Sequence, residues 1–374
     1  MISVCEPVLG EAEKANVMDC LAEGWISSGG PWVKRFEEEF SNYVECDFGI
    51  SVSNGTAALE VALYALGVKA GDEVIIPSFN IISAALAVHR LGCKPVLVDV
   101  DPETWCMTAD LVEQKITDKT AVILPVHMYG HPVDMDPIMA LAKRHNLRVL
   151  EDAAEVHGAE YKGKKCGAIG DAAIFSFYAN KLVTTGEGGM VVTSDETVAE
   201  RARDYRNLCF GTGPRFNHVD IGYNFRFTSL QAAIGCGQLT RIEQIVDKKR
   251  ELGEEYGRRL REIPGMQVQV EKDYAKAVYW MYCCVLGDEI DMPLDTVVAE
   301  LKNAGIETRP FFVGMHKQKP FLDLGLFEGE SYPVTDKLTE RGFYLPSSLN
   351  LSMENLEFIT KTLKDIICHG KALL

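Results

Sequence analysis

The chain has 374 residues, of which 47% are hydrophobic and 25% are charged, as in an ordinary globular protein long enough for two packed domains. Its formal net charge of −16 disfavours a nucleic-acid-binding protein, which would normally carry a basic excess, but allows a small anionic ligand to bind at a few local donors. No apolar run approaches the roughly 18 residues that a membrane span needs, and residues 1–7 show no signal-peptide pattern, so we expect a cytoplasmic protein.

Seven short apolar runs, rich in β-branched residues, mark the first half of the chain. Such runs are typical of strands that are covered on both faces of a parallel sheet. Helical patterns at residues 57–66 and 136–144 lie between several of them. The alternation predicts a wound α/β sheet of seven mostly parallel strands covered by helices. The predicted strands are residues 49–52, 73–77, 95–99, 121–126, 147–151, 173–177 and 189–193.

The second half of the chain has a different pattern. A long helical pattern runs from Ser229 through Leu239 towards Tyr256, and its charged stretch at residues 247–251 suits a helix that leaves the first domain. Strand patterns at 266–270 and 280–286 then mix with helical patterns at 294–303 and 353–368. We therefore predict a large domain over residues 1–247 and a smaller α+β domain over residues 248–374. Cys283 and Cys284 fall in one predicted strand and should point to opposite faces of it.

The segment at residues 53–58 follows the first predicted strand and opens a helix. The N–H groups and the positive dipole end at such a helix start form a phosphate cradle. Thr56 adds a hydroxyl group, and Gly55 lets the backbone approach a ligand closely. An ordinary capped helix start is the alternative interpretation.

Asp152 stands just past the fifth predicted strand, at the carboxyl end where α/β sheets bind their ligands. A carboxylate there could pair with a protonated pyridine nitrogen and keep a cofactor ring electron-withdrawing. The alternative is an aspartate that caps the start of a helix.

Lys181 follows the sixth predicted strand, enclosed by aromatic residues and by a glycine-rich turn at residues 184–190. Burial lowers the pKa of a lysine and frees its amine for imine chemistry, whereas a lone lysine is most often a solvated surface charge. Ser176 is placed near the end of the same strand for a second phosphate contact. Further along, Asn224 and Arg226 are polar residues among aromatic ones before the long helix.

Taken together, these segments resemble the DegT/DnrJ/EryC1/StrS family of nucleotide-sugar aminotransferases. The resemblance extends from residue 25 to residue 347. It is carried above all by Glu-Asp-Ala-Ala at 151–154, Asn-Lys at 180–181 and Thr-Gly-Glu-Gly-Gly at 185–189, in that order. It implies a fold-type-I enzyme that uses pyridoxal 5′-phosphate and works as a homodimer with shared active sites.

The resemblance also implies roles for single residues around the cofactor. Lys181 would hold pyridoxal phosphate as an imine and act as the general base. Asp152 would pair with the pyridine nitrogen, and Glu155 would lie near the 3-hydroxyl group. The residues that bind the phosphate group would be Gly55, Thr56 and Ser176, joined by Asn224 of the other subunit.

On the substrate side, the resemblance implies transfer of an amino group from L-glutamate to C4 of a nucleotide-linked 4-keto-6-deoxy sugar. The segments at residues 126–130 and 305–310 favour GDP-4-keto-6-deoxymannose as that sugar. The residues that would contact it are Trp25, Ser27, Tyr129, Arg309 and His316.

Two segments depart from the family pattern. Ile81 stands where relatives usually place an aromatic residue that stacks on the cofactor ring, and the loop from Gly211 to Asp220 replaces an aromatic-rich stretch. Because loops of this kind select substrates, a UDP- or dTDP-linked 4-keto-6-deoxyhexose stays open as the substrate. A pyridoxal-phosphate-dependent sugar dehydratase is disfavoured, since such relatives replace the lysine by histidine. No DNA-binding segment supports the last alternative, a regulator without turnover.

No metal site is expected from the pattern of cysteines and histidines. The 11 cysteines are scattered without a C-x-x-C pair, as in proteins that use them as small buried residues. No cysteine or carboxylate stands at ligand spacing from His127, His131 or His316. We expect His131, which precedes Pro132, to be structural.

Overall fold

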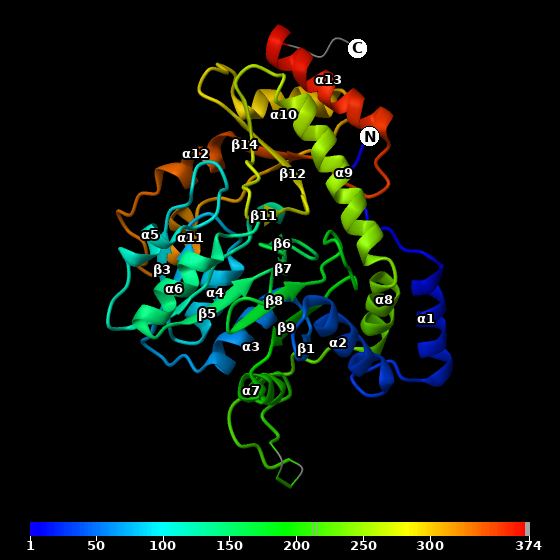
Figure 1. Ribbon diagram of the computed structural model, residues 1–374, viewed down its shortest axis with the longest axis vertical. Coiled ribbons are helices and arrows are strands. Elements are labelled where there is room, and N and C mark those ends of the chain that lie inside the picture. Colours follow the sequence, from blue (N-terminus) through cyan, green and yellow to red (C-terminus); the bar gives the residue numbers. More distant parts are fainter. Residues whose placement is uncertain (212, 215, 371–374) are drawn as a thin grey trace.

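A seven-stranded sheet occupies the centre of the computed structural model, which describes residues 1–211, 213–214 and 216–370 (Figure 1). The strand order is β1-β9-β8-β5-β4-β2-β3, and β9 runs in the opposite direction to the other six strands. The predicted wound and mostly parallel sheet is therefore confirmed. Its strands are β1 (Phe48–Val52), β2 (Glu73–Pro77), β3 (Lys94–Val98), β4 (Thr120–Ile123), β5 (Arg148–Asp152), β8 (Ala172–Ser176) and β9 (Gly189–Thr193).

The largest boundary difference is in β4, which ends at Ile123 although the apolar run continues to Val126. Pro125 explains the early end, because proline has no N–H group with which to continue the ladder. Val126 forms only an isolated bridge with Asp152.

Helices pack against the sheet along its width, from α2 and α7 at β1 to α4 at β3 (Figure 1). The two predicted helices of this part of the chain are α3 and α6, each slightly longer than its apolar pattern. The helices are α1 (Glu11–Glu23), α2 (Pro31–Val44), α3 (Gly55–Leu66), α4 (Ser83–Arg90), α5 (Ala109–Glu113), α6 (Met135–His145) and α7 (Glu196–Arg206).

The predicted long helix is interrupted. Helix α8 (Ser229–Leu239) and helix α9 (Ile242–Leu260) are separated at Thr240 and Arg241. The Thr240 hydroxyl donates to the carbonyl of Gly237 at 2.7 Å, and the Arg241 guanidinium pairs with Glu13 at 2.7 Å. These two contacts stabilise a turn that the helical pattern of the sequence does not reveal.

A second, four-stranded antiparallel sheet lies in the C-terminal part, with the order β10-β12-β14-β13. As predicted, the two adjacent cysteines of β12 point to opposite faces, because Cys283 belongs to the larger hydrophobic core and Cys284 to a second one. The strands are β10 (Met266–Val268), β12 (Tyr282–Leu286), β13 (Arg309–Pro310) and β14 (Gly342–Leu345), and the helices are α10 (Leu294–Asn303), α11 (Lys319–Leu322), α12 (Pro333–Arg341) and α13 (Met353–His369).

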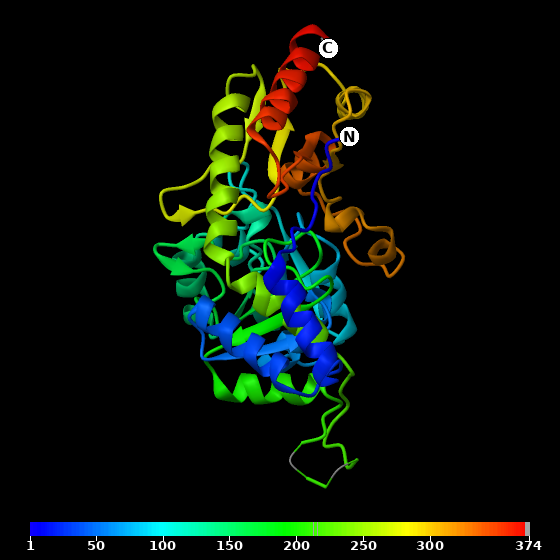
Figure 2. The ribbon, with the colours of Figure 1, turned by 90° about the vertical axis from the view of Figure 1, so that its right-hand side faces the viewer.

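The N-terminal residues accompany this C-terminal part. Ile2 donates to the carbonyl of Gly305 at 2.7 Å and accepts from the N–H of Glu307 at 3.0 Å, and Figure 2 shows the chain running from there down to α1. Helix α9 crosses residue 247 without a break. A division of the chain at that residue stays a prediction.

The remaining short elements are a small sheet of β6 (Glu160–Tyr161), β7 (Lys164–Lys165) and β11 (Ala275–Lys276), and the 3-10 helices Met128–Gly130 and Met315–Lys317. All 11 cysteines are free thiols. Over the described ranges, no helix combines the length and apolar character that crossing a membrane requires.

Candidate active site

A cavity of about 760 Å³ opens at the carboxyl edge of the large sheet. Its floor comes from the segments that follow β1 and β2 and from the ends of β5 and β8, and Trp280, Phe312 and Tyr344 of the C-terminal part complete its wall. This is the place where α/β sheets bind their ligands. Six of the predicted cofactor residues line it together, namely Gly55, Thr56, Asp152, Glu155, Ser176 and Lys181.

The start of α3 forms one end of this cavity. The Asn54 side chain caps the helix by accepting from the N–H of Ala57 at 2.8 Å, and the first turn of any helix offers further N–H groups to an anion. A Cβ atom on Gly55 would lie 2.9 Å from that of Ser176, so the helix start reaches the end of β8 only because residue 55 is glycine. The segment is thus a capped helix start and also a wall of the cavity.

Lys181 is not a surface lysine, because only 10% of its side chain is exposed. Its Nζ lies 3.6 Å from Oε1 of Glu155 and 3.5 Å from the centroid of the Trp280 ring. Burial lowers the pKa of this amine, and the negative charges of Glu155 and Asp152 oppose that shift. The result is an amine that gives up its proton more readily than an ordinary lysine.

The two carboxylates beside Lys181 are also buried. Asp152 ends β5 and accepts from the N–H of Ala154 at 3.1 Å; turns rather than a helix follow it, so the helix-cap alternative is wrong. Burial raises the pKa of Asp152. Burial also raises the pKa of Glu155 to about 7, against the opposing charge of Lys181. Oε2 of Glu155 accepts from the backbone N–H of Tyr129 at 2.7 Å, which fixes the side chain.

A buried histidine–carboxylate pair lies behind Asp152. Nε2 of His127 is 3.0 Å from Oε2 of Glu151, and the N–H of Val133 donates to Nδ1 of His127 at 3.0 Å. His127 must therefore carry its proton on Nε2. Burial opposes ionisation of Glu151, but hydrogen bonds from His127 and from two backbone N–H groups lower its pKa. This network holds the end of β5 rigid.

The predicted sugar-side residues do not line the cavity of the single chain. Trp25, Ser27 and Arg309 are exposed, and Arg309 pairs with Glu307 at 2.6 Å. Tyr129 is fully buried, with its ring stacked on Phe312 at 5.6 Å between centroids and with no hydrogen-bond partner for its hydroxyl.

His316 is buried and does not line the cavity. Its two ring nitrogens are 2.8 Å from Oγ of Ser78 and 3.0 Å from Oδ1 of Asp336. Both nitrogens are thus engaged by protein groups, and a direct sugar contact by His316 stays a prediction.

Asn224 is exposed and does not line the cavity of its own chain, and its backbone forms an isolated β-bridge with Asn207. The loop from Gly211 to Asp220 follows α7 at the edge of the molecule (Figure 1). Within it, Thr212 and Arg215 lie outside the described residues, and Nδ1 of His218 lies 2.6 Å from the carbonyl oxygen of Leu208. Ile81 does line the cavity, with 46% of its surface exposed.

The donors and acceptors of the cavity fit pyridoxal phosphate. The phosphate group of this cofactor suits the helix start with Thr56 and Ser176. Its pyridine nitrogen suits the carboxylate of Asp152, and its aldehyde suits the amine of Lys181. Asn80 is 2% exposed and lines the cavity, and its Nδ2 has no protein partner. Because the Ile81 N–H donates to Oδ1 of Asn80 at 2.7 Å, the amide is oriented and its N–H donors are left for a ligand.

Sequence reasoning missed Asn80, Trp280, Phe312 and Tyr344 as cavity residues. Asn80 could have been found, since it is a polar residue in the short segment that follows the predicted strand at residues 73–77. The other three come from a part of the chain at least 99 residues beyond Lys181, and no local pattern signals that they return to this cavity.

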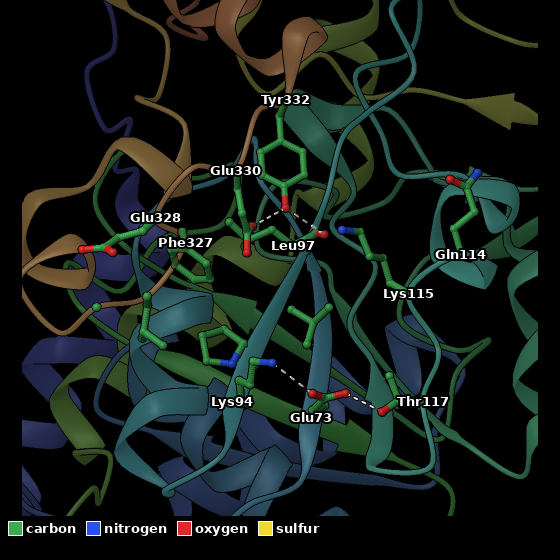
Figure 3. A pocket seen from close by; sticks show the side chains of 14 residues that line it. Glu73, Lys94, Leu97, Gln114, Lys115, Thr117, Phe327, Glu328, Glu330 and Tyr332 are labelled. Atoms are coloured by element: carbon green, nitrogen blue, oxygen red, sulfur yellow. Dashed lines mark hydrogen bonds and ion pairs between the residues drawn. The ribbon is translucent and has the colours of Figure 1, made fainter.

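A second cavity, of about 450 Å³, lies at the edge strand β3 (Figure 3). Glu73 pairs with Lys94 at 3.2 Å and accepts from Thr117 at 2.6 Å, and Tyr332 donates to Glu330 at 2.5 Å. These polar groups satisfy one another. We therefore place the reaction in the cavity that contains Lys181.

Comparison with known proteins gives a consistent result. The model of the DegT/DnrJ/EryC1/StrS aminotransferase family matches residues 7–364. A protein of Escherichia coli O157:H7 named GDP-perosamine synthase is 39% identical over 364 residues, which cover 97% of this chain and 98% of that protein. A protein of the same name from Caulobacter vibrioides is 38% identical over 370 residues, 98% of each chain. The solved structure of S. venezuelae DesV in complex with a ketimine intermediate has a TM-score of 0.89 at 33% identity, covering 96% of this chain and 94% of that one.

Proposed function

The chain belongs to the DegT/DnrJ/EryC1/StrS aminotransferase family, and on that premise we propose that it moves an amino group from L-glutamate to C4 of a nucleotide-linked 4-keto-6-deoxy sugar. It is a pyridoxal-phosphate-dependent sugar aminotransferase. The observation that carries the finer proposal is the meeting of Lys181 with Asp152 and Glu155 in one buried cavity. The names of two relatives favour GDP-4-keto-6-deoxymannose as the sugar, which would give GDP-perosamine.

The bound cofactor supplies an electron-withdrawing ring that stabilises negative charge at the carbon losing its proton. We assign its covalent attachment to Lys181. When its amine is free, Lys181 would take the proton from Cα of glutamate, a task that its lowered pKa favours. Asp152 keeps the ring nitrogen protonated through its negative charge. Gly55, Thr56 and Ser176 hold the phosphate group at the start of α3.

On the sugar side we keep Trp25, Ser27 and Arg309 as proposed contacts, because their exposed side chains are accessible to a large nucleotide or to a second copy of the chain. Tyr129 and His316 are buried and do not line the cavity, so they would act through the residues that they hold. Tyr129 holds Glu155 through its backbone N–H, and His316 holds Ser78.

The substrate proposal predicts the outcome of a panel assay. Full-length protein is incubated with L-glutamate and, in separate reactions, GDP-4-keto-6-deoxymannose, a UDP-linked and a dTDP-linked 4-keto-6-deoxyhexose. Mass spectrometry should find the 4-amino product from the GDP sugar. Omission of glutamate is the control for a donor-independent change. Product from a UDP or dTDP sugar, with none from the GDP sugar, would move the proposal to that nucleotide.

We also propose that the protein acts as a homodimer in which Asn224 of one copy binds the phosphate group held by Thr56 and Ser176 of the other. The exposure of Asn224 outside its own chain's cavity supports this arrangement. Each twofold-related site would then need Lys181 from one copy and Asn224 from its partner.

A mixed-dimer experiment tests this sharing. Lys181→Ala and Asn224→Asp should each be nearly inactive, the latter because it sets a carboxylate against a dianionic phosphate. After unfolding and refolding together in equal amounts, about half of the dimers are mixed and each contains one intact site. Roughly a quarter of wild-type activity should therefore return. Activity that stays at the sum of the two mutants, with subunit exchange demonstrated, would contradict the shared site.

A further inference from the structure

The amine of Lys181 lies against the face of an aromatic ring. Its Nζ is 3.5 Å from the centroid of the Trp280 ring, slightly closer than the 3.6 Å that separates it from Oε1 of Glu155. The face of an indole attracts a cation, and it does so more strongly where water is excluded. Only 10% of the Lys181 side chain and 4% of Trp280 are exposed, so this contact is largely dry.

Contacts of both its ring and its backbone carbonyl hold Trp280 in this position. Its Nε1–H donates to the carbonyl of Asn180, the residue before Lys181, at 2.7 Å. Its own carbonyl accepts from Nζ of Lys249 at 2.6 Å, and the same Nζ donates to the carbonyl of Ser347 at 2.5 Å. Lys249 is itself buried in α9. Turning the ring away from the amine would therefore break the Nε1–H hydrogen bond, while the contacts of Lys249 hold the backbone at Trp280.

The two neighbours of the amine differ in chemistry. Glu155 has a pKa of about 7, raised by burial, so its negative charge changes near neutral pH and it can exchange a proton with Lys181. An indole face attracts the ammonium group without competing for its proton. Its effect on Lys181 is the same across the pH range in which an aminotransferase base must work.

We propose that Trp280 is a positioning residue for Lys181: its indole face holds the ammonium group inside the cavity whenever the amine is not attached to the cofactor. This inference rests on the role proposed above for Lys181. A lysine that has just accepted a proton from a substrate carbon is an ammonium, and the ring stabilises that form. The same contact keeps the side chain within reach of the atom to which the proton returns.

The test measures the proton affinity of Lys181 in the full-length chain freed of cofactor. Trp280→Phe and Trp280→Leu both lose the indole N–H and have similar volumes, but only phenylalanine keeps an aromatic face. Acetic anhydride labels neutral amines only, so the extent of labelling of the Lys181 peptide against pH, read by mass spectrometry, gives a midpoint. That midpoint should lie about half to one pH unit higher in the Phe variant than in the Leu variant, because only phenylalanine still attracts the ammonium form.

Phe312→Leu is the matched control, because Phe312 lines the same cavity but stacks on Tyr129. It should leave the midpoint of Lys181 near its wild-type value. Water that enters an enlarged cavity affects the Phe and Leu variants alike. The other titratable groups that influence or respond to the amine also affect both variants equally, and they are Asp152, Glu155, His157 and Cys5. If the Leu variant does not fold, Trp280→Met takes its place, since methionine adapts to irregular space.

Equal midpoints in the Phe and Leu variants, or a higher one in the Leu variant, would overturn the proposal. The comparison uses no cofactor and no sugar. It can therefore fail while Lys181 is still the residue that holds pyridoxal phosphate, and it can succeed even if another lysine does so.

Discussion

Replacing Lys181 by alanine is expected to lower the rate of sugar amination by at least about a thousandfold, because in the proposed mechanism one side chain both holds the cofactor and moves the substrate proton. The alanine variant should keep the fold, since it removes a buried amine without adding volume. A small primary amine such as methylamine, added to the variant, should restore part of the rate by replacing the missing base.

Lys319→Ala is the control for the loss of a lysine as such, because Lys319 lies in the solvent with 83% of its side chain exposed. Its activity should equal that of the wild type. A Lys181→Ala variant that retained more than about a tenth of the wild-type rate would be incompatible with the role assigned to this amine.

Asp152→Asn is expected to cost roughly a hundredfold to a thousandfold in kcat, the usual effect of removing one preorganised charge from the reacting centre. Asparagine has nearly the same shape and can still accept from the Ala154 N–H. It cannot carry the negative charge that keeps a ring nitrogen protonated. The loss should therefore appear in kcat while the protein still binds the cofactor, as its absorbance spectrum would report.

The same substitution at Asp19, an exposed residue of α1, serves as the control and should leave kcat unchanged. An Asp152→Asn variant with a normal kcat would show that this carboxylate does not act on the ring. A variant that failed to bind the cofactor at all would assign Asp152 a binding role instead of the electronic one.

Much of the fold could be predicted because its signals are local. The strands of the large sheet are buried on both faces and so appear as apolar β-branched runs, as at Glu73–Pro77. The predictions were wrong or imprecise where one residue overrides the pattern. Pro125 ends β4 early, and the turn at Thr240 and Arg241 divides the long helix through contacts with Gly237 and Glu13.

That the proposed cofactor residues meet in one cavity could be predicted for a related reason. Asp152, Ser176 and Lys181 end or follow strands whose carboxyl ends meet at one edge of the sheet, so short segments place them together. Trp280 falls in a run predicted as a strand, yet β12 begins at Tyr282, and the Trp280 carbonyl accepts from Lys249 rather than from a ladder partner. Contacts between distant parts of the chain, with Lys249 of α9 and with Asn180, hold the indole beside Lys181.

The residues that would contact the sugar or the second subunit could not be predicted from local sequence patterns in the same way. Trp25, Ser27 and Arg309 are exposed in the single chain, and Asn224 is exposed and does not line its own chain's cavity. The roles proposed for these residues would depend on a bound nucleotide or a second copy of the chain, which no periodicity in one sequence encodes. Ile81, in contrast, lines the cavity as its position after β2 implies, and there it presents an aliphatic surface.

The most direct test of the central assignment is to trap the cofactor on the lysine that holds it. Full-length protein is incubated with pyridoxal phosphate, reduced with borohydride, digested and analysed by mass spectrometry. Lys249 is a natural competitor inside the same molecule, because burial lowers its pKa to about 8 and its amine is also enclosed. We expect to recover the reduced cofactor on Lys181; its recovery on Lys249 or on any other lysine, with Lys181 unmodified, would contradict the assignment.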